Sequence, residues 1–177
     1  MKTIALAAAG SLLALWASTA NAATVVALTG DNTLVTVDTE TKAATGTQTV
    51  GGVEGKLLGI DVRPSDKKLY GLFADGTVAT IDPATGTATK VDKLKKVPPA
   101  DATVTVDFNP AADALRIMGS DGTSLRTKFA QGAVTEDGRH AFGDGDMNKG
   151  ATPNIVAGAY TNSYAGTEKT ALYNIDG

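Results

Sequence analysis

The sequence of 177 residues contains no cysteine and only one histidine, His140. The absence of cysteine excludes disulfides, thiol catalysis and cysteine metal sites, so packing and strand pairing must hold the fold together. One histidine cannot build a zinc site by itself and has no visible nucleophile to activate, so we expect His140 in a polar surface loop. The serines lack the G-x-S-x-G pattern of serine hydrolases. The formal net charge of -3 provides no overall basic field, and no nucleic-acid partner is expected.

Long apolar runs are also scarce, with one exception at the N-terminus. Met1-Lys2 is followed by an apolar run from Ile4 to Trp16 and by the small residues of Ala20-Asn21-Ala22. This order predicts a secretory signal peptide at residues 1–22, with Ala23 as the mature start and a periplasmic or extracellular location. The apolar run is shorter than the roughly 20 residues of a spanning helix, so no membrane span is expected after cleavage.

An internal repeat is the strongest positive signal. Between Leu58 and Thr89, short β-branched and aliphatic runs alternate with turn residues, which indicates four antiparallel strands. The landmarks that recur 46 residues later are Asp61, Pro64, Leu69, Asp75-Gly76-Thr77 and Gly86, matched by Asp107, Pro110, Leu115, Asp121-Gly122-Thr123 and Gly132. A further set lies 44 residues earlier, at Asp31-Asn32-Thr33, Asp38 and Thr41. A period near 45 residues with four strands per unit predicts an all-β, β-propeller-like array of four-stranded antiparallel blades.

The repeats place the blades within a single domain at 23–177. The expected ranges are 24–50, 57–91, 103–142 and a partial blade at 154–177. Three blades and a fragment fall at or below the roughly 4 to 8 blades of closed rings, so closure stays open. Either Ile155–Thr161 pairs with Thr24–Leu28 to complete the first blade, or the free edges associate with another chain.

Several residues have structural interpretations at this stage. Asp61 and Asp107 resemble a catalytic pair, but each precedes an x-Pro turn, which favours turn capping. Most aromatic residues fall inside the expected strands, where packing between blades is the default. Tyr164, beside small and polar residues, is expected in an exposed loop.

A candidate metal site lies in the Gly-Asp-rich stretch before the last blade. Asp144, Asp146 and Asn148 alternate like the first three ligands of a calcium-binding loop. The pattern then departs from such a loop, because Lys149 and Ile155 stand where glycine and glutamate are required. The alternatives are a calcium site and a plain connection between blades, and no other cofactor is expected.

The segments LLGIDVRP, KLYGL, DFNPAADALRI, GATPNIVAGAYTN and ALYNID carry a resemblance that covers essentially all of the mature chain. They resemble the secreted bacterial family catalogued as domain of unknown function 4394, a family of propeller-like repeats. The resemblance implies the fold and export, and it implies no activity or functional residue. Members of that family usually continue past the position matching Asp176, so the chain resembles either a short form or the front part of a longer domain.

Three classes of function fit these observations. The repeats and the lack of a nucleophile-base set favour an exported, non-catalytic binding or scaffold module for a protein or glycan ligand. A structural subunit that self-associates through open sheet edges is the second class. The third is an enzyme that uses loop carboxylates, with Asp144 and Asp146 as its candidates.

Overall fold

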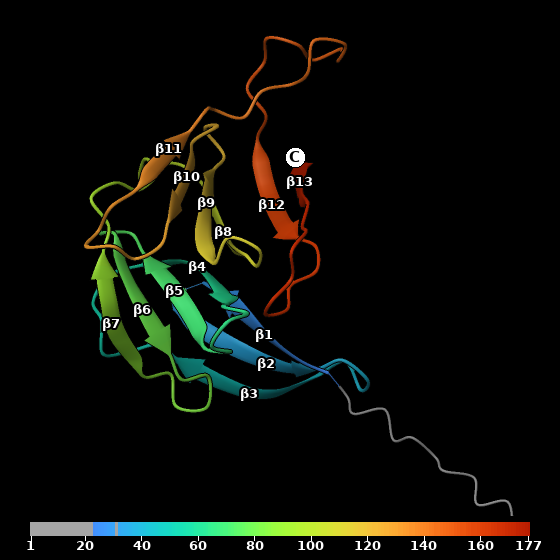
Figure 1. The fold of residues 1–177 in the computed structure, drawn as a ribbon. Helices are drawn as coiled ribbons and strands as arrows, with labels where there is room; N and C mark the ends of the chain where they lie inside the picture. The colour runs from blue at the N-terminus through green and yellow to red at the C-terminus, as the bar shows by residue number, and fades with distance from the viewer. Residues whose placement is uncertain (1–22, 31) are drawn as a thin grey trace, which may run out of the picture.

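The computed structural model describes residues 23–30 and 32–177, and their regular structure is entirely antiparallel β-sheet. The predicted signal peptide at 1–22 and Asp31 lie outside the described residues. Four sheets follow one another along the chain (Figure 1). Blade 1 contains β1 (Thr24–Thr29), β2 (Thr33–Asp38) and β3 (Ala43–Thr49). Blade 2 contains β4 (Leu57–Val62), β5 (Leu69–Phe73), β6 (Thr77–Ile81) and β7 (Ala88–Lys93).

Blade 3 repeats this order and blade 4 is a hairpin. Blade 3 contains β8 (Val104–Asn109), β9 (Ala114–Gly119), β10 (Ser124–Thr127) and β11 (Thr135–Asp137). Blade 4 contains β12 (Ile155–Tyr160) and β13 (Leu172–Asp176). The long connection from β11 to β12 extends away from the sheets (Figure 1). Within the part of the chain that the structure describes, no helix is long and apolar enough to cross a membrane.

The blades stack face to face, as in a propeller. The first strands of blades 2, 3 and 4 are neighbours, because β8 contacts both β4 and β12. One apolar core lies between blades 1 and 2 and contains Leu34, Val50, Leu57, Leu69, Phe73, Ala79, Ile81 and Ala88. A second core lies between blades 2 and 3 and contains Tyr70, Leu72, Val78, Leu94, Val106, Phe108, Leu115, Ile117 and Leu125. The structure therefore confirms the predicted all-β, propeller-like array.

The array is open. Among the described strands, β1 pairs only with β2, and β12 pairs with β13. The expectation that Ile155–Thr161 pairs with Thr24–Leu28 is therefore wrong for this chain. The reason is the place that β12 takes in the array. It is the inner strand of blade 4, beside β8, and its backbone pairs with β13 rather than with β1.

Gly86 and Gly132 recur in the repeat because each lies where two successive blades meet. Gly86 and Gly132 have φ angles of +73° and +74°, and a Cβ on either residue would lie within 2.4 Å of a backbone oxygen of the preceding blade. The partners of this close approach are Thr49 O for Gly86 and Lys93 O for Gly132. Only glycine allows this backbone conformation and this approach without strain. The outer ends of neighbouring blades are thus joined in the same way twice.

Candidate binding site between the first two blades

Two aspartates, Asp107 buried and Asp61 half-buried, join the inner strands of successive blades. The carboxylate of Asp61 on β4 accepts a hydrogen bond from the backbone N–H of Phe108 on β8, at 2.7 Å. Between blades 3 and 4, the carboxylate of Asp107 on β8 accepts a hydrogen bond from the backbone N–H of Tyr160 on β12. The turn-capping role expected for both residues is therefore wrong. Both lie inside strands that continue past them, and their carboxylates reach the next blade.

These two carboxyl groups also interact with each other. Asp107 is only 8% exposed, and burial raises its pKa, with the adjacent Asp61 carboxyl raising it further. Two carboxylates in one partly buried site do not both ionise readily, because desolvation and mutual repulsion both oppose the second charge. Both carboxyl groups accept hydrogen bonds from backbone N–H groups of the next blade, so the pair serves as a structural link between blades.

The aspartate link has two ends in the described chain. In blade 4 the register pairs Ala159 with Tyr173, as it pairs Asp107 with Arg116 in blade 3. Ala159 therefore stands where the other inner strands carry aspartate. At the other end, the backbone N–H of Val62 occupies the place of the Phe108 N–H, and it donates to the carboxylate of the adjacent Asp61 at 2.7 Å. No strand of a preceding blade supplies that acceptor among the described residues.

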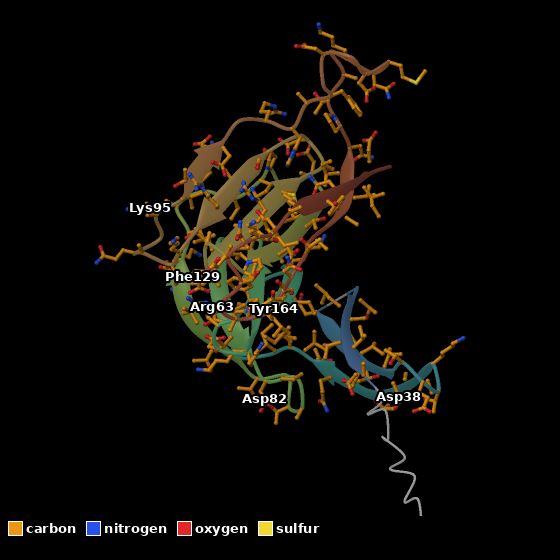
Figure 2. The ribbon with its side chains drawn as sticks, turned by 45° about the vertical axis from the view of Figure 1, so that its right-hand side comes forward. Asp38, Arg63, Asp82, Lys95, Phe129 and Tyr164 are labelled. Carbon is orange, nitrogen blue, oxygen red and sulfur yellow. The ribbon has the colours of Figure 1, made fainter. Side chains whose placement is uncertain are left out.

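The interface between blades 2 and 3 is filled by three aromatic rings. The Tyr70 ring stacks on Phe129 with centroids 5.5 Å apart and meets Phe108 edge-on at 5.3 Å. The Arg63 guanidinium lies 5.8 Å from the Tyr70 centroid and 5.6 Å from that of Phe129. Figure 2 shows Arg63 and Phe129 close together at this interface. Such offset and edge contacts, with a cation over the ring faces, stabilise beyond the area that they bury.

An ion pair fixes the arginine in place. Its Nε and Nη2 donate to the two carboxylate oxygens of Asp113, at 2.8 and 2.5 Å. Asp113 lies in the turn between β8 and β9, so the pair joins blade 2 to blade 3. The guanidinium of Arg63 holds the pKa of Asp113 below its usual range. This two-point geometry is the strong form of an arginine-carboxylate contact.

Between blades 1 and 2, beside the apolar core, the space that corresponds to these three rings is not filled. By the repeat spacing, Val26 stands in the place of Tyr70, Val62 in that of Phe108, and Pro83 in that of Phe129. All three residues line a cavity of about 750 Å³. Replacing three rings by two valines and a proline removes the side-chain volume that closes the second interface. The cavity is therefore the unfilled counterpart of a packed interface.

The cavity is lined by both apolar and polar residues. The residues that line it are Val26, Val62, Lys67, Lys68, Leu69, Thr80, Ile81, Asp82, Pro83, Thr85, Thr87 and Thr89. Lys67 stands in the place of Asp113, so the charge at this position is reversed from the second interface. Lys67 and Lys68 are both exposed. The Asp82 carboxylate accepts from the Ala84 backbone N–H at 2.8 Å and belongs to its own turn. Figure 2 shows Asp82 at the end of blade 2 that faces blade 1.

The predicted calcium ligands lie elsewhere, in the exposed connection between β11 and β12. Asp144 pairs with the Lys149 ammonium at 3.2 Å, and Asp146 accepts from the backbone N–H of Asn148 at 2.8 Å. Within the described ranges, no three histidine, aspartate or glutamate side chains are grouped so as to hold a metal ion. These carboxylates contact residues of their own loop, and the calcium site stays a prediction.

His140 and Tyr164 were also singled out from the sequence. Tyr164 is 56% exposed, as expected. His140 is half-buried, and its Nε2 is enclosed without a hydrogen-bond partner in the described part of the chain. Burial lowers the pKa of His140, and the nearby positive charge of Arg116 adds to this effect. The neutral ring is therefore favoured.

Comparison with known proteins gives a family match and a distant structural likeness. A sequence profile described as "Domain of unknown function (DUF4394)" matches residues 33–177. A search of curated proteins finds no match. One similar solved structure is described as the crystal structure of the Myceliophteria thermophila Cps50 (Swd1) beta-propeller domain, with 13% sequence identity and a TM-score of 0.43. The similarity covers 77% of this chain and 42% of that chain, so the protein spans less than half the length of that domain.

Proposed function

The chain belongs to the DUF4394 family, and from this premise we propose that the protein is an exported, non-catalytic binding module with its ligand site at the interface of blades 1 and 2. The observation that carries the proposal is the cavity of about 750 Å³ lined by Val26, Val62 and Pro83. Its volume falls within the range of about 300 to 1,000 Å³ that is typical of ligand sites. The packed second interface, built from the same repeat, makes the empty space specific to this position.

The lining supports binding rather than catalysis. Five of the lining residues are apolar, and the polar groups are threonine hydroxyls, two lysines and an aspartate that bonds to its own turn. In the described part of the chain, His140, the single histidine of the sequence, does not line the cavity. A cavity lined by apolar side chains and by two exposed lysines suits a ligand that presents an apolar part and a negative group.

An anionic apolar dye tests the proposal directly. We expect 8-anilinonaphthalene-1-sulfonate to bind at one site per molecule, with the enhanced fluorescence of an apolar environment. A double substitution, Val26→Tyr with Pro83→Phe, places the ring types of the second interface in the first and should remove most of this fluorescence. The matched control is Tyr173→Ser, which removes a 68% exposed ring on β13 and should leave the signal unchanged. Full fluorescence in the filled variant would contradict the proposal.

A second candidate function is the structural subunit that self-associates through its sheet edges. The observation that favours it is the exposure of Tyr173 and Ile175 on β13, at 68% and 61%. Apolar side chains on an edge strand are a known route to pairing between chains. Sedimentation of the wild-type protein and of a Tyr173→Lys variant separates the two functions, because only self-association through β13 is lost in the variant.

A further inference from the structure

The edge of β1 that does not pair with β2 lies beside the cavity. In blades 2 and 3 the equivalent edge, that of β5 or β9, pairs with the first strand of the blade. In blade 2, β4 pairs with β5, and Asp61 lies opposite Tyr70 in that register. Val26 is the repeat counterpart of Tyr70 and lies on β1. A strand added to β1 in the same register would therefore place its own residue opposite Val26. That residue would correspond to Asp61.

The bonds that such a strand must satisfy can be read from the other interfaces. Asp61 accepts from the Phe108 N–H, and Asp107 accepts from the Tyr160 N–H. The equivalent donor in blade 2 is the Val62 N–H, which among the described residues bonds to the Asp61 carboxylate of its own strand. An aspartate opposite Val26 would give Val62 the same acceptor that its two counterparts have.

Two more positions of the added strand are specified in the same way. Three residues before each aspartate, Leu58 and Val104 pack against the core between blades 2 and 3. Two residues after Asp61, Arg63 binds the carboxylate of Asp113. In the first interface Lys67 replaces that aspartate, so the matching residue must be acidic.

We propose that the open edge of β1 binds an extended segment of a partner polypeptide in which an apolar residue is followed by aspartate three positions later and by an acidic residue five positions later. This mode is strand addition to a sheet edge, in which backbone bonds give affinity and side-chain contacts give specificity. The proposal rests on the proposed function, because the side chains of the added strand would enter the same cavity. Val26 and Val62, which the strand would contact, both line it.

A second copy of this chain does not fit the same requirements. Its nearest equivalent, β12, carries Ala159 at the aspartate position and Thr161 two residues later. It therefore supplies neither an acceptor for the Val62 N–H nor a negative charge for Lys67. The residues of the first interface therefore favour an acidic strand from a different polypeptide.

The probe is a fluorescein-labelled peptide with the sequence of residues 56–64, KLLGIDVRP, in which Arg63 is replaced by glutamate. Fluorescence polarisation should show binding of this peptide to the purified protein. The peptide that retains arginine and a peptide with alanine in place of aspartate should each bind about tenfold more weakly, the loss expected for one charged hydrogen bond.

A charge exchange makes the test specific. Lys67 has a φ of 62° and Asp113 a φ of 48°, so aspartate is already used in this left-handed conformation at the equivalent turn position. In the variant Lys67→Asp, the preference should invert, with the arginine peptide binding about tenfold more tightly than the glutamate peptide. Hydrogen exchange at β1 should slow when the peptide is bound, while exchange at β13 should not change.

Three outcomes would overturn the inference. The first is equal binding of the arginine and glutamate peptides to both proteins. The second is an absence of binding or of protection at β1. The third is a wild-type protein that sediments as a dimer and releases no monomer when peptide is added, which would identify a second copy as the occupant. If the dye binds the wild type but not the filled variant, and no peptide binds, this inference alone is contradicted. If the dye binds the wild type and the filled variant equally, the proposed function is contradicted.

Discussion

Val62 and Phe108 occupy the same place in successive blades, yet Phe108 is completely buried and Val62 is 45% exposed. Both residues also present the equivalent backbone N–H, one to its own strand and the other to Asp61. The contrast shows that the repeat preserves the backbone frame at both interfaces and places a large buried ring at this position in only one of them.

This contrast predicts unequal costs of truncation. Phe108→Ala should lower the free energy of unfolding by about 3 to 5 kcal/mol, because it removes a buried ring from the second interface and leaves a cavity. Val62→Ala should cost less than about 1 kcal/mol, because the side chain is half-exposed and already borders an open space. Urea unfolding of both variants measures the difference. Equal losses would mean that the first interface is packed as tightly as the second.

The raised pKa of Asp107 predicts a dependence of stability on pH. Its folded-state pKa lies above the value of about 3.9 for an unfolded aspartate, so the native state binds more protons over the interval between the two values. The contribution of this group to stability is complete below about pH 4 and is lost as the pH rises through the folded-state pKa.

Asp107→Asn tests this dependence, because asparagine retains an acceptor for the Tyr160 N–H and stays neutral. We expect the variant to gain stability relative to the wild type as the pH rises from about 4 towards neutrality and above. The control is Asp101→Asn, at an exposed position. This variant should show the same slope of unfolding free energy against pH as the wild type. Parallel curves for the wild type and Asp107→Asn would show that Asp107 ionises normally in the folded protein.

Arginine 63 gives a prediction about geometry rather than charge. Arg63→Lys keeps the positive charge but loses the two-point contact with Asp113 and the planar cover over the rings, and it should cost about 1 kcal/mol. The matched control is Lys96→Ala, which removes an ion pair with Glu136 between side chains that are 48% and 61% exposed. Because exposed pairs contribute little, we expect a loss below about 0.5 kcal/mol there. If chemical denaturation gives both variants the same loss of unfolding free energy, Arg63 contributes no more than an exposed charge.

The repeat spacing was sufficient to predict the architecture from the sequence. Asp75-Gly76 and Asp121-Gly122 marked their turns correctly, because an Asx turn is a local structure. The Asp75 carboxylate accepts from the Thr77 N–H at 2.8 Å, and Asp121 accepts from the Thr123 N–H at 3.1 Å. Local bonds of this kind depend on residues two positions apart, so the sequence contains all the information needed to recognise them.

The aspartates and the cavity required information that is not local. Asp61 was assigned to a turn because Pro64 follows it closely, but its partner Phe108 is 47 residues away along the chain. The cavity also left no local signal, since Val26 and Pro83 are unremarkable residues in a strand and a turn. A comparison of residue size between repeats would have shown it, because small residues replace Tyr70 and Phe129 together.

The open end of the array gives the last prediction. All residues of β5 are buried and the strand has a partner on each side. By contrast, four of the five residues of β13 are exposed, and among the described strands it pairs with β12 alone. Local opening requires least free energy where few apolar contacts must be broken. In a protein confirmed as monomeric by sedimentation, amide hydrogen exchange should therefore be much faster at 170–175 than at 69–73. Exchange at 170–175 as slow as at 69–73 would mean that the ends of the array are paired within one chain, and the open arrangement of β1 and β13 would then be wrong.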